Sequence, residues 1–259
     1  MATEPYVQVS NLARTFRGPQ GEVRALHGVS LSIGDGEFVA VLGPSGCGKS
    51  TMLLMVAGLL PPSGGEVRVA GRPVSRPITD VGIVFQNSVL LDWLTVLGNT
   101  LFLVDLRRLP RQQYEPRARE LLRAVGLGEF ERHRPYQLSG GMKQRTSICR
   151  ALVLDPPLLL MDEPFGALDA LTREQMRLDL ERLWLDSPKT VMFITHSIEE
   201  AVMLADRVVI LSPRPGRVER IIEIDLPRPR GLDARRDPKF VEYEQAITDI
   251  FLAGGVLHA

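Results

Sequence analysis

Hydrophobic and polar residues alternate in the first part of the chain and give way to short, wholly apolar runs. The alternation occurs at residues 6–9, 28–33 and 65–71, and it is typical of antiparallel strands with one solvated face. Residues 38–42 are apolar at every position, as expected of a strand buried on both faces of a parallel sheet. The pattern therefore predicts a small antiparallel sheet together with the first strand of a parallel one.

Further apolar runs follow, and stretches with helical periodicity separate them. The runs that we expect to form buried strands are residues 81–85, 158–161, 191–194 and 208–211. The stretches that we expect to form helices are residues 170–184, 198–205 and 239–252. Strands that alternate with helices in this way predict an α/β fold, with a mostly parallel sheet and helices on its faces.

The middle of the chain has a different pattern, with no convincing strand between residues 88 and 155. Residues 101–109, 114–125 and 140–154 are predicted to be helical, with breaks at Pro110 and Gly126. We therefore expect residues 88–155 to form a helical subdomain inserted into one domain of residues 1–259. Residues 1–87 and 156–259 would form the α/β core and the antiparallel sheet. Residues 213–216 and 227–231 are predicted to be loops.

Composition narrows the class of protein. The 31 acidic and 31 basic residues balance, so the chain lacks the positive field of a protein that grips nucleic acid. Its two cysteines cannot form a disulfide framework, which favours reduced thiols in the cytoplasm. We expect no signal peptide and no membrane-spanning helix in this chain. A partner would have to supply any membrane span.

A phosphate loop is predicted directly after the buried strand at residues 38–42. The loop has the pattern of glycine, four residues, then Gly-Lys-Ser, and a helical run follows it. Its glycines let successive backbone N–H groups point at a phosphate, which the start of the next helix also attracts. We expect Lys49 to reach the β- and γ-phosphates of ATP and Ser50 to bind Mg²⁺. An ordinary glycine-rich turn leaves the flanking strand and helix unexplained. The nucleotide-binding residues are predicted to be Gly43, Pro44, Ser45, Gly46, Cys47, Gly48, Lys49, Ser50 and Thr51.

Two carboxylates, Asp162 and Glu163, end the apolar run at residues 158–161. Taken alone, such a pair more often forms a solvated turn. In a chain that also has a phosphate loop, the pair favours a catalytic role. We expect Asp162 to hold Mg²⁺ through water and Glu163 to act as the general base for the attacking water.

The segment Leu138-Ser139-Gly140-Gly141-Met142-Lys143-Gln144-Arg145 resembles the signature motif of ABC ATPases. The order of motifs resembles that family over nearly the whole chain. This resemblance implies a P-loop NTPase (RecA-like) core with an N-terminal antiparallel β-subdomain and an inserted α-helical subdomain.

The resemblance also implies roles for single residues. Phe16 lies where the family has an aromatic that stacks on adenine, and packing in the β-subdomain is the alternative. Gln86 resembles the Q-loop glutamine, which contacts the metal and the reacting phosphate, and Asp169 resembles the D-loop aspartate. His196 resembles the switch histidine, although a lone histidine after an apolar strand is often structural. The implied catalytic residues are Glu163, His196 and Gln86, and the implied metal ligands are Ser50, Gln86 and Asp162.

The signature motif also implies a dimer. Ser139 is a good helix N-cap, and the glycines after it leave backbone N–H groups open to an anion. An ordinary helix cap is the alternative interpretation. In the family, this helix end faces the γ-phosphate of ATP on another subunit. The resemblance thus implies a homodimer, or a pair with a homologous ATPase. The nucleotide contacts implied in this part of the chain are Ser139, Gly140, Gly141, Gln144 and Asp169.

The apolar run at residues 88–96 is either core or an exposed strip. The resemblance favours a groove for the coupling helix of a permease, although Asp92 and Gly98 depart from the frequent family pattern. It implies partners in the form of integral-membrane permease subunits and a periplasmic or lipoprotein substrate-binding protein. The expected location is the cytoplasmic face of the inner membrane, as a peripheral protein.

Residues 162–169 resemble the importer branch, and residues 211–218 resemble the nitrate, sulfonate and taurine subfamily. We therefore expect an ATP-hydrolysing subunit of an importer for a small anion or sulfonate. An importer ATPase for another small solute and a soluble ABC ATPase outside transport are the alternatives. An exporter cassette is a further rival, and a small-molecule kinase leaves the signature motif unexplained.

Overall fold

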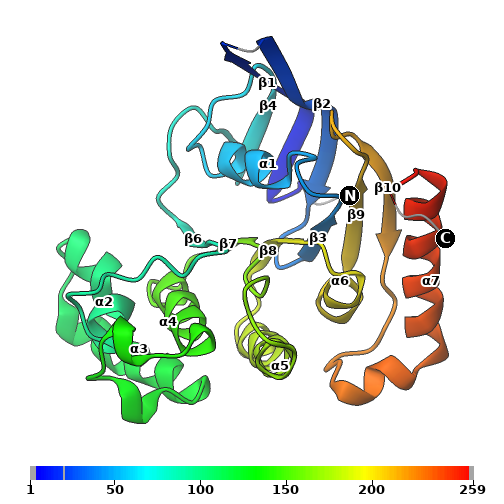
Figure 1. Cartoon of the computed structure of the whole chain (residues 1–259). Helices are drawn as coiled ribbons and strands as arrows, with labels where there is room; N and C mark the ends of the chain where they lie inside the picture. Colours follow the sequence, from blue (N-terminus) through cyan, green and yellow to red (C-terminus); the bar gives the residue numbers. More distant parts are fainter. Residues whose placement is uncertain (1–3, 20, 257–259) are drawn as a thin grey trace. The chain divides into compact units, whose positions relative to one another are not determined.

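The computed structural model describes residues 4–19 and 21–256, and the chain divides into two compact units. The first unit comprises the chain up to Thr79 and from Pro188 onward, and the second unit comprises Asp80–Ser187. Figure 1 shows the elements of both units in chain order. The segment 88–155 lies within the second unit, and its boundaries as a subdomain stay a prediction.

The first unit contains an antiparallel sheet in the order β2-β1-β4-β5. Its strands are β1 (Val7–Gly18), β2 (Gly21–Ile33), β4 (Gly64–Val69) and β5 (Arg72–Pro73). Val7, Val9 and Leu12 are buried whereas Gln8 between them is exposed, which confirms the alternation that predicts these strands. The β1–β2 hairpin is longer than the sequence pattern predicts. Its distal half has few buried residues and lacks the apolar alternation, so the pattern does not reveal that half.

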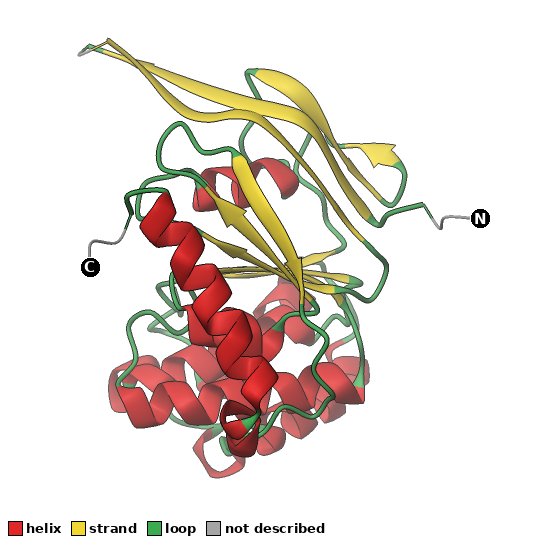
Figure 2. Ribbon diagram, turned by 90° about the vertical axis from the view of Figure 1, so that its right-hand side faces the viewer, coloured by secondary structure: helices red, strands yellow, loops and turns green. Residues whose placement is uncertain are grey.

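A second sheet in the first unit has the order β10-β9-β3-β8. Its strands are β3 (Phe38–Leu42), β8 (Thr190–Thr195), β9 (Arg207–Leu211) and β10 (Val218–Glu223). The first three are parallel, and β3 is buried at every position, as its continuous apolar sequence predicts. The antiparallel β10 was not predicted, because it is mostly solvent-exposed and carries no apolar run. Figure 2 shows the strands of the chain in yellow and its helices in red.

The helices of the first unit are α1 (Lys49–Val56), α6 (Ile198–Leu204) and α7 (Pro238–Ala253). Ser197 caps the N-terminus of α6, and Asp237 caps α7 just before Pro238, a residue that suits the first helical position. A short 3-10 helix, Leu232–Arg236, precedes α7.

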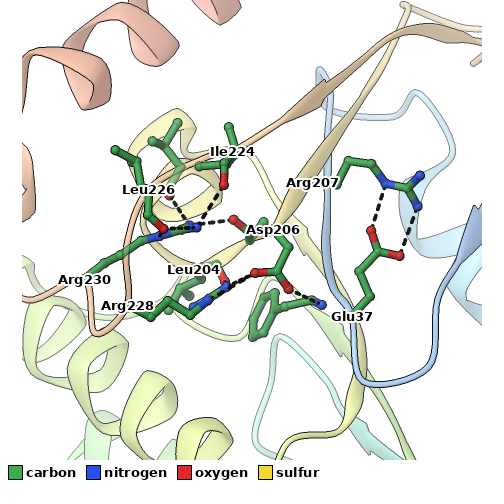
Figure 3. Close-up of polar contacts among 11 residues, drawn as sticks. Glu37, Leu204, Asp206, Arg207, Ile224, Leu226, Arg228 and Arg230 are labelled. Atoms are coloured by element: carbon green, nitrogen blue, oxygen red, sulfur yellow. Dashed lines mark hydrogen bonds and ion pairs between the residues drawn. The ribbon is translucent and has the colours of Figure 1, made fainter.

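Two arginines after β10 tie the C-terminal segment to the end of α6 (Figure 3). Arg230 is only 2% exposed and donates hydrogen bonds to the carbonyl oxygens of Val202, Ala205, Ile224 and Leu226. Arg228 donates to the carbonyl oxygen of Leu204 and to the carboxylate of Asp206. A guanidinium at a helix C-terminus satisfies the last carbonyl groups and complements the helix dipole. The predicted loop at residues 227–231 is therefore held firmly in place.

The second unit pairs two parallel strands, β6 (Val81–Val84) and β7 (Leu158–Asp162), and adds a group of helices. The helices are α2 (Val96–Leu106), α3 (Arg111–Ala124), α4 (Gly140–Leu152) and α5 (Ala170–Asp186). Two short 3-10 helices, Gly128–Phe130 and Pro135–Gln137, lie between α3 and α4. Residues 88–155, all of which the structure describes, contain no strand, as the sequence predicts.

The start of α2 was predicted wrongly at residue 101. The helix begins at Val96, because Thr95 caps it and accepts a hydrogen bond from the N–H of Gly98. Asn99 is fully buried, and its amide donates to the carbonyl oxygens of Leu91, Leu94 and Thr95. Backbone carbonyls thus satisfy a polar side chain that a hydrophobicity pattern treats as exposed.

Within the described residues, none of the helices has both the length and the apolar character needed to cross a bilayer.

Candidate functional site

The phosphate loop, residues 43–50, joins β3 to α1 in the first unit and closes on its own backbone. The ammonium of Lys49 donates to the carbonyl oxygens of Gly43 and Pro44 at 2.7 and 3.1 Å, and the side chain is 5% exposed. Gly48 has a φ of 104°, and a Cβ there would lie 2.6 Å from a methyl group of Leu26. This position therefore excludes any residue except glycine.

The loop has one open and one buried side. Ser45, Gly46 and Ser50 are exposed, whereas the Cys47 side chain is 1% exposed. The Cys47 thiol is therefore closed to a phosphate, and the Cys47 backbone N–H donates to the carbonyl oxygen of Pro44 at 3.3 Å. The open side, at the start of α1, combines glycine backbone with a helix N-terminus, which is the chemistry that anions prefer.

His196 lies beside the start of this loop. Strands β3 and β8 are parallel, with Leu42 paired to Thr195, so Gly43 and His196 follow paired positions at the same edge of the sheet. The His196 side chain is exposed. The first unit thus brings the predicted phosphate loop and the predicted switch histidine together.

The two neighbours of His196, Thr195 and Ser197, form a hydrogen-bonded turn that the sequence analysis does not predict. The hydroxyl of Thr195 donates to the buried carboxylate of Glu200 at 2.5 Å and accepts from the N–H of Ser197 at 3.0 Å. Ser197 in turn caps α6 by accepting from the N–H of Glu200. The sequence signal was the serine three residues before a glutamate, the pattern of a capping box.

In the second unit, β6 and β7 bring Gln86 and the acid pair together in the same manner. Val84 pairs with Met161, so both chain segments leave the sheet at one edge. Asp162 is the last residue of β7, and the amide Nε2 of Gln86 lies 3.4 Å from Oε2 of Glu163, to which it donates.

Glu163 has a left-handed backbone, with a φ of 44°. This conformation is costly for a residue with a side chain and is concentrated at functional sites. The carbonyl oxygen of Glu163 accepts from the N–H of Gly166, so the turn is fixed by the backbone. The strained turn aims the carboxylate of Glu163 at Gln86 and argues against an ordinary solvated turn.

The signature helix α4 begins at an open tip. Ser139 and Gly140 are exposed, and the Ser139 hydroxyl accepts from the N–H of Met142 at 3.3 Å. Gly141 is buried against α5, because a Cβ there would lie 2.3 Å from the methyl group of Thr172. The first residues of α4 are thus exposed at Ser139 and Gly140 and packed against α5 at Gly141.

Asp169 lies at the start of α5 and caps that helix. Its carboxylate accepts from the N–H of Thr172 at 3.0 Å, and the hydrogen bonds from Thr172 lower the pKa of Asp169. Since Gly141 packs on the same Thr172, the signature tip and Asp169 are neighbours within the second unit.

Gln144 faces away from this tip. Its side chain is 3% exposed, and its amide donates to the carbonyl oxygen of Phe85 at 3.2 Å. In this arrangement Gln144 anchors the segment that leads to Gln86. Its contact with a nucleotide stays a prediction.

Phe16 lies at the surface on β1 with 39% of the residue exposed. The guanidinium of Arg14 lies over the ring at 4.7 Å from the ring centre and also donates to the carbonyl oxygen of Pro61. The ring thus has the exposed position that stacking on a base requires.

The apolar run at residues 88–96 is partly exposed rather than a core segment. Val89 is 60% and Trp93 70% exposed, and Phe85 just before the run is 37% exposed. Arg150 of α4 donates to the carbonyl oxygens of Ser88 and Val89, which fixes the start of the run. Exposed apolar side chains of this size favour a partner surface.

The described residues contain no group of three or more His, Cys, Asp or Glu side chains placed to hold a metal ion. Ser50 at the start of α1 in the first unit and Asp162 at the end of β7 in the second unit each carry an oxygen of the kind that Mg²⁺ prefers. This ion usually takes one or two protein ligands and completes its shell with phosphates and water.

Comparison with known proteins shows the family of the chain. The family model described as ABC transporter matches residues 26–166. A taurine import ATP-binding protein of Burkholderia pseudomallei is 48% identical over 239 residues, covering 90% of this chain and 92% of the relative. An uncharacterised ABC transporter ATP-binding protein of Methanocaldococcus jannaschii is 46% identical over 94% of this chain and 90% of that protein.

Solved structures of an ATP-binding cassette are also similar. One is a dimer in a post-hydrolysis state, bound to ADP and Pi, with a TM-score of 0.75 and 34% identity. The match covers 85% of this chain and 99% of that one.

Proposed function

The chain belongs to the ABC transporter family and is an ATPase of that family, and from this premise we propose that it drives the import of taurine or a closely related sulfonate. The ATPase side of the proposal is supported above all by the phosphate loop, with its open glycine backbone beside Lys49. The cargo rests on the identity of 46 to 48% to proteins described as taurine import ATP-binding proteins.

The nucleotide is bound by the first unit in this proposal. The backbone of residues 43–51 cradles the phosphates, and Lys49 leaves its carbonyl partners to reach the β- and γ-phosphates. Phe16 stacks on the adenine ring, for which its exposed position on β1 is suitable.

Hydrolysis requires the second unit as well. Ser50, Asp162 and the amide oxygen of Gln86 would hold Mg²⁺, and the ion would supply positive charge that offsets the charge of the phosphates. Glu163 accepts a proton from the attacking water, and His196 donates to the γ-phosphate. The hydrogen bond between Gln86 and Glu163 supports these roles, because it joins the proposed metal ligand Gln86 to the proposed general base Glu163.

A second copy of the chain, or a homologous ATPase, completes each site. Its exposed tip at Ser139 and Gly140 offers backbone N–H groups to the γ-phosphate, and Gly141 and Asp169 complete the facing surface. The dimeric state of the similar ATP-binding cassette supports this arrangement. In a two-fold symmetric, isologous pairing of this kind, the loop of each protomer faces the tip of the other.

The transport partners are a membrane permease and a substrate-binding protein. The exposed apolar side chains of Phe85, Val89 and Trp93 form the surface for a permease helix, directly beside Gln86. The chain then acts at the cytoplasmic face of the membrane as a peripheral subunit.

The test is reconstitution of the chain in liposomes with the permease and binding protein encoded beside it. We expect taurine to stimulate ATP hydrolysis and to be imported, and short alkanesulfonates to compete. Glu163→Gln serves as the inactive control. Stimulation by an unrelated solute and not by sulfonates would contradict the cargo. If the reconstituted complex imports no solute and hydrolyses ATP only at the rate of the isolated chain, the transport role is contradicted.

A further inference from the structure

The loop between β9 and β10, residues 212–217, lies directly against the phosphate loop within the first unit. The N–H of Gly216 donates to the carbonyl oxygen of Ala25, and its own carbonyl oxygen accepts from the N–H of His27. A Cβ on Gly216 would lie 2.1 Å from the carbonyl oxygen of Cys47. Backbone therefore touches backbone here, and no side chain separates the two loops.

Arg214, at the tip of this loop, extends to the open side of the phosphate loop. Its Nη2 lies 3.3 Å from the position that a Cβ of Gly46 would occupy. Gly46 is exposed and has a φ of 74°, so it belongs to the part of the loop whose backbone is free to receive a ligand. The lack of a side chain at Gly46 is what leaves room for the guanidinium.

The guanidinium of Arg214 has no counter-charge within the part of the chain that the structure describes. No residue in 4–19 or 21–256 forms a hydrogen bond or an ion pair with it, and the side chain is exposed. Its neighbours add positive rather than negative potential, since Lys49 and the N-terminus of α1 lie in the same loop. A cation held among like charges is unfavourable until an anion joins them.

We propose that Arg214 binds the phosphates of the nucleotide and is an additional ligand of the phosphate loop. The anion is the diphosphate part common to ATP and ADP, because backbone N–H groups in the middle of such a loop cradle the α- and β-phosphates, whereas the lysine reaches the β- and γ-phosphates. Guanidinium groups suit this task, since they donate several hydrogen bonds in a fixed fork. The inference rests on the proposed nucleotide site and adds a residue to it.

The loop also supplies a matched control. Arg217 is exposed, lies in the same loop and carries the same charge, and its backbone N–H and carbonyl oxygen both bond to Ser212. If a general positive field attracts the nucleotide, both arginines contribute. If direct contact with the phosphates is required, only Arg214 contributes to nucleotide binding.

The experiment is titration of the purified full-length chain with ATP and with ADP by calorimetry, for wild type, Arg214→Gln, Arg214→Lys and Arg217→Gln. We expect Arg214→Gln to raise the Kd of both nucleotides by about tenfold, the size of one charge-assisted hydrogen bond. Arg214→Lys should lie between wild type and Arg214→Gln, because a lysine keeps the charge but loses the fork. Arg217→Gln should change either Kd by less than about twofold.

Three results would overturn the inference while leaving the proposed function intact. They are an unchanged Kd in Arg214→Gln, an equal loss in Arg217→Gln, or a loss confined to ATP. Circular dichroism of each variant verifies folding, and should Arg214→Gln not fold, Arg214→Lys carries the test with an expected loss of about threefold. Failure of the wild-type chain to bind either nucleotide would instead refute the proposed function itself.

Discussion

The two units of the chain assemble their site residues by the same device but hold them very differently. In each unit, neighbouring parallel strands end at one edge, with Leu42 paired to Thr195 in the first unit and Val84 to Met161 in the second. In the first unit, Lys49 is 5% exposed and bonded to two carbonyl oxygens. In the second unit, Gln86 is exposed and meets Glu163 through one bond of 3.4 Å.

This difference indicates a division of labour. A loop whose glycine backbone is already in place, with the buried Lys49 held beside it by two carbonyl oxygens, is largely organised for an anion before it binds, which favours affinity. The exposed side chain of Gln86 has one hydrogen bond, to Glu163, although Gln144 and Arg150 hold the backbone on either side of it. We therefore expect this side chain to respond to what binds nearby. We infer that changes in the phosphate loop alter nucleotide affinity, whereas changes at Gln86, at Glu163 or around His196 alter turnover.

The largest effect is expected from Glu163→Gln in the second unit. In the proposed mechanism the carboxylate of Glu163 is the proton acceptor, so its removal should lower kcat for ATP hydrolysis by about a hundredfold or more, whereas the Kd for ATP should stay within about twofold of wild type. Steady-state hydrolysis and calorimetry measure the two quantities. Glu120→Gln, at an exposed position of α3, is the matched control and should leave both unchanged.

The converse effect is expected from Lys49→Ala in the first unit. In the proposed site the ammonium of Lys49 donates charge-assisted hydrogen bonds to the phosphates, so we expect its loss to weaken ATP binding by about a hundredfold. Lys239→Ala removes a lysine from the exposed face of α7, where it pairs with Asp225, and should not change the Kd. Unaltered ATP binding in Lys49→Ala would contradict the inference that the phosphate loop of the first unit determines nucleotide affinity.

A smaller effect sharpens the comparison at the turn around His196. Thr195→Val keeps the shape of the side chain but removes the hydroxyl that bonds Glu200 and Ser197. Misplacing His196 should lower kcat by about tenfold with little change in the Kd for ATP, and Thr195→Ser should restore most of the activity. Equal kcat values in the valine and serine variants would show that the turn does not position His196.

The smallest effect concerns the seat of the signature tip, where two adjacent glycines differ. A Cβ at Gly141 would lie 2.3 Å from a Thr172 methyl group, whereas the nearest atom to a Cβ at Gly140 is 4.0 Å away. Gly141→Ala should therefore destabilise the protein by about 2 kcal/mol and lower its Tm by about 4 °C. Gly140→Ala should leave Tm nearly unchanged. Thermal unfolding of both variants decides, and equal Tm values would contradict the described packing of α4 on α5.

The sequence predicted those parts of the site that consecutive residues define. The phosphate loop and the acid pair each follow a buried strand, and this local context identifies them. Strand β10 was missed because it lies mostly exposed at a sheet edge. The Thr195–Glu200 bond was missed because it forms only once the chain turns into α6.

Gln144 shows how helical geometry separates neighbours in a motif. It lies five residues after Ser139, and in a helix with 3.6 residues per turn that spacing reaches a different face. The structure accordingly has Ser139 exposed and Gln144 buried against Phe85. The motif predicts nucleotide contact for both Ser139 and Gln144, whereas their different positions around the helix leave the first exposed and the second buried.

Dimerisation is tested by the mass of the Glu163→Gln protein in solution, measured by light scattering with and without ATP and Mg²⁺. We expect a dimer only when the nucleotide is present, and a monomer when Ser139→Arg is added to block the tip of α4. A monomer at saturating ATP, with Ser139→Arg alone hydrolysing ATP at the wild-type rate, would contradict this expectation.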